Sequence, residues 1–204
     1  MSVEKPTRRY QLHKRADAME DTRRRITVAA MELHGTLGPA RTTMTAVAER
    51  AGVQRQTVYR HFANEDELLA ACSAHYGARH PWPDADRWAA IADPGERLRV
   101  ALDELYGWYE ATGDMWTRVL RDETLVAAIG PALAPFRAYL DEAARVLAAG
   151  WGARGGRRAT LLAATRHAVD FHTWRSLARD GGVSRAGVAE LTAAMVHRAA
   201  VRDG

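Results

Sequence analysis

Residues 42–62 read TTMTAVAERAGVQRQTVYRHF, which is a pattern of two short helical segments around one glycine. The inner face of the first segment is small and apolar: Ala46, Val47 and Ala48. Gly52 stands where the chain must turn, and glycine tolerates the positive φ that such a turn requires. Three apolar residues are spaced to pack the second segment on a core: Val53, Val58 and Phe62. The pattern predicts a helix-turn-helix.

The outward face of the second segment is polar and basic. It carries Arg55, Gln56, Tyr59 and Arg60, with Thr57 at its margin. Arginine and glutamine side chains match the hydrogen-bonding edges of guanine and adenine in the major groove. A helix pair around a glycine is also how many bundles turn a corner, so the spacing alone leaves both readings open.

Residues 22–69 resemble the N-terminal DNA-binding domain of the TetR (tetracycline-repressor) family. The resemblance rests on residues 42–47, on AERAGV at 48–53, on TVYRHF at 57–62 and on NEDELL at 64–69. It implies an all-α fold, in which an N-terminal helix-turn-helix domain precedes a helical ligand-binding and dimerisation domain. We expect about nine helices in total. The length of 204 residues fits this family.

The resemblance also implies roles for single residues. Contacts with the DNA backbone are expected from Thr43, Thr57, Tyr59 and His61, and contacts with base edges from Arg55 and Gln56. A purely structural role for His61 stays open. Many family members have a lysine near the start of the fourth helix, where this chain has Glu65. That phosphate contact is therefore in doubt, and we expect Arg60 or the N-terminal arm to compensate.

Positive charge is concentrated in the first third of the chain. The whole chain has a net charge of +4, but residues 1–62 contain twelve Lys or Arg against six Asp or Glu. Such a field attracts a polyanion. We predict a basic, mobile arm over residues 1–20. Its basic residues and the start of the first helix form either a solvated surface or a minor-groove contact: Lys5, Arg8, Arg9, Lys14, Arg15, Arg23, Arg24 and Arg25.

Apolar residues recur at helical spacing almost throughout, and alternating strand patterns are nearly absent. We predict a DNA-binding domain over residues 21–69 and a ligand-binding and dimerisation domain over 70–204. The helices are expected at 22–34, 43–62 (two), from 64 to the Pro81-Trp82-Pro83 break, 94–112, 114–128, 131–149, 157–179 and 184–201. Asp93-Pro94-Gly95-Glu96 has the residues of a helix start.

The predicted second domain is rich in aromatic residues. Aromatic side chains in a helical bundle are more often plain core than ligand wall, yet a small-molecule pocket needs such a lining with a few polar groups. Both readings stay open. As candidate ligand-binding residues we take Trp82, Trp88, Tyr106, Tyr109, Trp116, His167 and Phe171.

The last two predicted helices carry apolar stripes. These are Leu161, Leu162, Ala164, Ala168 and Phe171, and then Val188, Leu191, Ala194, Met195 and Val196. A monomer could bury them internally. In the family they form a dimer interface, and a palindromic operator demands two-fold symmetry. We therefore expect a homodimer.

Several other classes of protein do not fit the sequence. Cys72 is the only cysteine, so a reducing cytoplasm is expected, and no apolar stretch is long enough to span a membrane. GWGARG at 150–155 matches a dinucleotide motif in letters but follows no strand. His75 and His80, and likewise His167 and His172, are five residues apart, whereas helical metal ligands are three or four apart. We expect no enzyme activity, catalytic residue, cofactor or metal.

The sequence thus favours a cytoplasmic, ligand-responsive repressor that binds a palindromic DNA operator as a dimer and is released by a small, mainly apolar or aromatic effector. An activator or a nucleoid-type protein with the same module remains open. So does a small helical ligand carrier or enzyme whose helix-turn-helix is incidental.

Overall fold

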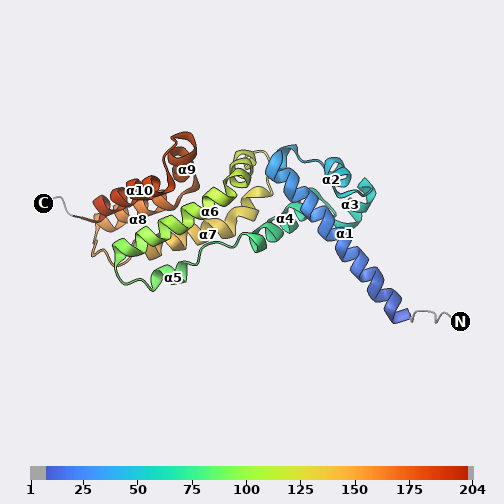
Figure 1. Ribbon diagram of the computed structural model, residues 1–204, viewed down its shortest axis with the longest axis horizontal. Coiled ribbons are helices and arrows are strands. Elements are labelled where there is room, and N and C mark those ends of the chain that lie inside the picture. The colour runs from blue at the N-terminus through green and yellow to red at the C-terminus, as the bar shows by residue number, and fades with distance from the viewer. Residues whose placement is uncertain (1–7, 202–204) are drawn as a thin grey trace. The chain divides into compact units, whose positions relative to one another are not determined.

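The computed structural model describes the backbone of residues 8–201 and the side chains of residues 13–201. Helices form most of this part of the chain, which contains no strand (Figure 1). The all-α prediction is confirmed. The elements are α1 (Arg8–Thr36), the 3₁₀ turn η1 (Pro39–Arg41), α2 (Met44–Ala51), α3 (Arg55–His61), α4 (Glu65–Arg79), α5 (Ala85–Ala89), α6 (Pro94–Asp122), α7 (Ile129–Leu147), α8 (Gly156–Val169), α9 (Phe171–Trp174), the π-helical turn η2 (Arg175–Asp180) and α10 (Arg185–Ala200).

The chain divides into two compact units. Unit 1 comprises Met1–Arg79 and Asp114–Ala132, and unit 2 comprises His80–Gly113 and Leu133–Gly204. Helices α6 and α7 therefore contribute to both. The predicted division at residue 70 differs from this one because residues 114–132 pack with a segment that lies far away in the sequence. No local pattern reveals such a pairing.

The core of unit 1 is built by α1 to α4. Its buried side chains are Ile26, Ala29, Ala30, Met44, Val47, Ala48, Ala51, Val58, Phe62, Leu68 and Cys72. Burial raises the pKa of the Cys72 thiol to about 12. This cysteine is therefore a core residue and not a reactive thiolate.

Helix α1 begins at Arg8, well before the predicted start at Thr22. Residues 13–20 are exposed, so burial does not hold this extension in place. Once the buried part of α1 is formed, extending the helix by further turns costs little free energy. Ala16 and Ala18 are also strong helix formers. The arm predicted over residues 1–20 is thus helical from Arg8. Residues 1–7, with Lys5, and the side chains of Arg8 and Arg9 lie outside the described parts.

Helix α6 is continuous where two helices were predicted with a break near Gly113. A Cβ atom added at Gly113 would lie 3.0 Å from the Trp174 ring. Glycine costs about 1 kcal/mol in a helix interior, but here it allows an indole to pack against the backbone. Gly113 is therefore a packing position within a helix and not a helix end.

Two other differences arise from short-range capping. The segment predicted as one helix over 157–179 breaks at Asp170, whose Oδ1 accepts a hydrogen bond from the His172 N–H at 2.7 Å and starts α9. The short helix α5 was not predicted; Asp84 caps it through the Asp86 N–H at 3.0 Å.

The core of unit 2 lies among α6, α7, α8 and α10. Its buried side chains include Leu98, Leu102, Leu105, Tyr106, Tyr109, Leu147, Leu161, Val188 and Val196. Helices α8 and α10 pack against each other along their length (Figure 1). None of the described helices has the length and hydropathy needed to cross a membrane.

Candidate nucleic-acid interface

Helix α2 and the turn after it form as the sequence predicts. Thr43 is the N-cap of α2, and its Oγ1 accepts a hydrogen bond from the Ala46 N–H at 3.1 Å. Gly52 adopts the left-handed conformation, with φ 66° and ψ 41°. The Val53 N–H then donates to the Ala48 carbonyl at 3.0 Å, which closes the turn. The next helix starts two residues later.

Helix α3 presents one apolar and one polar face. Val58 and the following Phe62 are fully buried in the unit 1 core. The residues predicted to face outward are exposed: Arg55, Gln56, Tyr59 and Arg60. Thr57, at the margin of this face, is half-buried. The seven residues of α3 therefore display a polar and basic surface over about two helical turns.

The exposed side chains of α3 are held by one another. The Arg55 guanidinium donates to the Tyr59 hydroxyl at 3.2 Å and lies 5.4 Å from the centre of its ring. The Arg60 guanidinium donates to the Thr57 hydroxyl at 2.9 Å. These contacts restrict long, flexible side chains, which lowers the entropy that they lose on binding.

Two arginines of α1 hold the ends of the helix-turn-helix. Arg25 donates to the carbonyl of Ala51, the last residue of α2, at 2.6 Å. Arg23 donates to the carbonyl of His61, the last residue of α3, and its guanidinium lies 4.1 Å from the centre of the Phe62 ring. Basic side chains at these carbonyls complement the helix dipoles.

This role for Arg23 and Arg25 was missed by sequence reasoning, which offered a solvated surface or a minor-groove contact. No local signal reveals this role, because each arginine reaches a carbonyl far away in the sequence, at His61 and Ala51. Arg24 instead pairs with Asp21 on the surface at 2.7 Å. Lys14 and Arg15 are also exposed on α1.

His61 is half-buried at the end of α3. Burial lowers the pKa of its imidazole, and the nearby Arg23 and Arg60 lower it further, against an opposing effect of Glu20. The neutral ring keeps one N–H donor. His61 is thus able to donate a hydrogen bond without carrying a charge.

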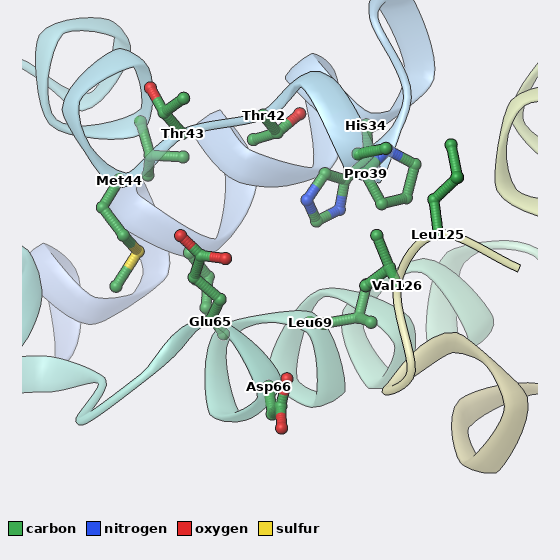
Figure 2. Close-up of a pocket in the computed structure, with 13 residues that line it drawn as sticks. His34, Pro39, Thr42, Thr43, Met44, Glu65, Asp66, Leu69, Leu125 and Val126 are labelled. Carbon is green, nitrogen blue, oxygen red and sulfur yellow. The ribbon is translucent and has the colours of Figure 1, made fainter. Parts of the chain in front are cut away.

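The first turn of α4 is acidic. Asn64 Oδ1 accepts from the Glu67 N–H at 2.9 Å, and Glu67 Oε2 accepts from the Ala63 N–H at 2.8 Å, so the predicted cap at Asn64 is confirmed. Glu65 is exposed in this turn. Glu65 lines the same cavity as Thr43, which is the residue predicted to contact the DNA backbone (Figure 2). The Glu65 carboxylate therefore lies on the same side of unit 1 as Thr43.

Residues 26–72 match the model of the family described as bacterial regulatory proteins, tetR family. They contain the helix-turn-helix and the start of α4. Residues 26–72 thus form a TetR-family N-terminal domain. The resemblance inferred from residues 22–69 is confirmed, and the helix-turn-helix lies within the part of the chain that matches this family.

Solved structures of TetR-family regulators share the fold over most of the chain. A TetR-like regulator from Rhodococcus sp. RHA1 is 20% identical, with a TM-score of 0.58, over 87% of this chain and 94% of that one. The regulator PfmR from Thermus thermophilus is 17% identical, with a TM-score of 0.59, over 85% and 97%. A regulator from Streptomyces coelicolor is 17% identical, with a TM-score of 0.58, over 88% and 79%. No curated protein matched the chain.

The predicted ligand-binding residues lie in both units of the chain. Trp116 belongs to unit 1, whereas the other six lie in unit 2. Trp88, Tyr106, Tyr109 and Phe171 are almost fully buried. Three of them already have protein partners: Tyr106 donates to the Ala168 carbonyl at 2.7 Å, Tyr109 to the Val169 carbonyl at 2.6 Å and Trp88 to Glu104 at 2.8 Å.

The remaining two candidates lie nearer the surface. His167 is exposed, and its ring is 3.2 Å from the Thr173 hydroxyl. Trp82 is 37% exposed and, with Tyr139, lines a cavity of about 290 Å³ beside the start of α5. Trp82, a member of the predicted set, therefore lines a cavity of unit 2.

An aromatic cluster connects these positions within unit 2. It consists of Trp82, Trp108, Tyr109, Phe136, Tyr139, Phe171 and Trp174, with neighbouring ring centres 5.2 to 5.6 Å apart at Trp82–Tyr139, Trp108–Phe136, Trp108–Tyr109 and Tyr109–Phe171. The Tyr139 hydroxyl and the Trp174 Nε1–H are buried, and neither has a hydrogen-bond partner among the described residues. Sequence reasoning did not single out these two groups, because burial without a partner has no local signature.

Proposed function

We propose that this TetR-family regulator is a repressor that binds a palindromic operator as a homodimer and is released by a small, mainly apolar or aromatic effector. The observation that carries the proposal is the exposed polar face of α3, which is held by Arg23 and Arg25 at the ends of the two helices. Its place of action is the cytoplasm, where bacterial DNA lies.

DNA reading is assigned to the exposed residues of α2 and α3. Thr43, Thr57, Tyr59 and His61 contact phosphates, which fixes the register of the domain on the duplex. Arg55 and Gln56 contact base edges and supply the choice of sequence. Arg60 adds positive charge on the same face. The hydroxyl of Thr43 retains its proton for a phosphate, because its oxygen accepts the Ala46 N–H.

Dimerisation is assigned to the outer faces of α8 and α10. Of the predicted apolar stripes, five residues are buried inside unit 2: Leu161, Ala168, Phe171, Val188 and Val196. Leu191 is 54% exposed, Ala194 is exposed, and Leu162, Ala164 and Met195 are half-buried. This second set supports an interface between two copies.

Sedimentation tests the dimer. At micromolar concentration we expect twice the chain mass of 22.5 kDa. Leu191→Glu should shift the equilibrium toward monomer, because it places a charge in the interface. Met19→Glu, which changes an exposed apolar residue of α1, is the matched control. A monomeric wild-type protein at this concentration would contradict the proposal that a homodimer binds a palindromic operator.

Effector binding is assigned to the aromatic cluster. The Tyr139 hydroxyl and the Trp174 Nε1–H offer hydrogen bonds to a ligand that inserts between the rings, since both are buried without a partner. To release DNA, the effector must bind more tightly to the conformation that does not bind the operator. Entry of the ligand should therefore rearrange this cluster.

The experiment combines DNA binding with tryptophan fluorescence. A gel shift with the DNA upstream of the chain's own gene should show a complex, and aromatic substrates of the neighbouring gene's product should quench tryptophan and release the DNA at matching concentrations. Trp174→Phe keeps an aromatic side chain but removes the N–H, and it should weaken binding of the effector. Stoichiometric binding with unchanged operator affinity contradicts induction.

Two alternatives give different results in the same assays. An activator with the same module would bind the same DNA, but transcription in vitro would rise and not fall when the protein is added. A ligand carrier with an incidental helix-turn-helix would bind the effector and leave the DNA unshifted.

A further inference from the structure

Unit 1 contains a cavity of about 450 Å³, and none of its lining residues belongs to the aromatic cluster of unit 2. It lies between the end of α1, the start of α2, the start of α4 and the segment that follows α6 (Figure 2). A volume in this range is typical of small-molecule sites. Its lining comes from four segments, so an occupant would contact all of them at once.

The cavity has an apolar wall and a polar end. Pro39, Leu69, Leu125 and Val126 form the apolar wall. Figure 2 shows Glu65 pointing into the space from the first turn of α4, whereas the carboxylate of Asp66 points away from it. Among the described residues, no cationic side chain pairs with Glu65. This arrangement suits a molecule with an apolar body and a positive end.

His34 provides an independent observation. Its side chain is 8% exposed, and the ring faces the cavity between the apolar wall and Glu65 (Figure 2). Within the described part of the chain the imidazole makes no hydrogen bond. Burial lowers its pKa to about 4, with a smaller opposing effect of the Asp122 charge, so the ring is neutral near pH 7. A neutral imidazole offers one donor and one acceptor.

The balance of charge at this end favours a cation. The N-terminus of α4 contributes about half a positive charge. Against it stand the carboxylates of Glu65, Asp66 and Glu67, of which Glu67 is paired with Arg23 at 3.5 Å. The Asp66 carboxylate points away from the cavity, and the full negative charge of Glu65 by itself exceeds the positive charge of the helix dipole (Figure 2). An anionic ligand would therefore be repelled from the space that Glu65 enters.

We propose that this cavity binds a small amphipathic cation, namely a protonated amine with an apolar or aromatic body. The ammonium group pairs with Glu65, the body packs on Leu69, Leu125 and Val126, and His34 accepts or donates a hydrogen bond. This site is separate from the effector site proposed in unit 2. It rests on contacts within unit 1 alone, so its test needs no DNA.

The test uses three probes of the same shape on the full chain: 4-phenylbutylamine, 4-phenylbutanol and 4-phenylbutyrate. Binding is followed by calorimetry and by the imidazole NMR signals, with the His34 signal assigned from a His34→Gln variant. The amine should shift the His34 signal and bind at least about tenfold more tightly than the alcohol, as a charge-assisted hydrogen bond implies. The acid should bind most weakly.

Two variants with the same chemical change locate the charge. Glu65→Gln should remove the preference for the amine over the alcohol. It should fold, because Glu65 is exposed. Asp66→Asn, one residue away, should keep the preference within about twofold. Equal binding of amine and alcohol, equal effects of the two variants, or an amine that leaves the His34 signal unmoved would each overturn the proposal. The outcome is independent of operator binding and of the unit 2 effector.

Discussion

The carboxylate of Asp122 accepts a hydrogen bond from the backbone N–H of Ala40 at 3.0 Å, although 82 residues separate the two in the chain. Arg121 holds the same carboxylate at 2.7 Å and also donates to the Leu37 carbonyl at 2.9 Å. These hydrogen bonds lower the pKa of Asp122 in spite of its burial. Within unit 1, the end of α6 thereby holds the loop that leads from α1 into the helix-turn-helix.

Gly38→Ala should destabilise the protein. Gly38 has a φ of 94°, and an added Cβ would lie 2.3 Å from Asp122 Oδ2, so both the backbone and the carboxylate would have to move. We expect a loss of about 1 to 3 kcal/mol in the free energy of unfolding, measured with urea. Gly77→Ala is the control, because nothing lies within 4 Å of its added Cβ in α4.

The control should change stability in the opposite direction. Alanine in a helix interior is favoured over glycine by about 0.5 to 1 kcal/mol, so Gly77→Ala should stabilise the protein. If Gly38→Ala were as stable as the wild type, the Asp122–Ala40 hydrogen bond would not fix the conformation of this loop.

The difference between Gly52 and Asp122 explains which parts of the fold could be predicted. Gly52, Asn64 and Asp93 make hydrogen bonds with backbone groups three or four residues away, so the turn, the α4 cap and the start of α6 could be predicted from the sequence. The links from Asp122 to Ala40 and from Arg25 to Ala51 depend on packing between distant segments. The same holds for Gly113, whose role appears only once Trp174 is packed against it.

The candidate site divides in the same way. Exposure of the α3 face follows from helical periodicity around Val58, which is local information. Hydrogen-bond partners and cavities depend on residues far apart in the sequence. Tertiary packing places the Tyr106 and Tyr109 hydroxyls against carbonyls, and it leaves the Trp174 Nε1–H without a partner among the described residues. Aromatic composition therefore indicated only a region, and it did not identify the buried groups that lack a hydrogen-bond partner.

Stability should fall in mild acid because of His34. Its pKa is about 4 in the folded protein and 6.5 for the ordinary group, so the unfolded chain binds the proton first. The stability that the neutral His34 ring contributes is fully present above pH 6.5, the ordinary pKa, and it is lost as the pH falls from there toward the folded pKa of about 4. By linkage, the free energy of unfolding should be about 2 kcal/mol lower near pH 5 than near pH 7.5 from this group alone.

Urea unfolding of the wild type and of His34→Gln at the two pH values isolates this effect. The variant should lose most of the additional acid sensitivity, while the exposed His13→Gln control should retain it. Asp122 acts against the shift by stabilising the imidazolium, so Asp122→Asn should increase the sensitivity of the wild-type histidine. An unchanged pH profile in His34→Gln would assign the acid sensitivity to other groups.

Arg55 and Thr43 should separate sequence choice from general affinity. Arg55→Ala and Gln56→Ala should each cost about 1 to 3 kcal/mol on the cognate site and little on a scrambled duplex. Thr43→Ala should weaken both duplexes alike. Because Thr43 also caps α2, its loss costs about 1 kcal/mol of stability, and Thr43→Ser should restore both properties. Equal losses on both duplexes for Arg55→Ala would make Arg55 a phosphate contact.

Glu65→Lys should raise the affinity for DNA of any sequence. The carboxylate lines the same cavity as Thr43, so it lies near the proposed phosphate contacts, and the substitution changes the local charge by two units. An added phosphate contact releases about one counterion, so the slope of log affinity against log salt should steepen by about 1. Asp180→Lys makes the same charge change in unit 2 and should leave the slope unchanged. Fluorescence anisotropy on cognate and scrambled duplexes over a range of salt concentrations gives both the affinity and its salt slope. A gain in affinity confined to the cognate duplex would mean that position 65 contacts a base.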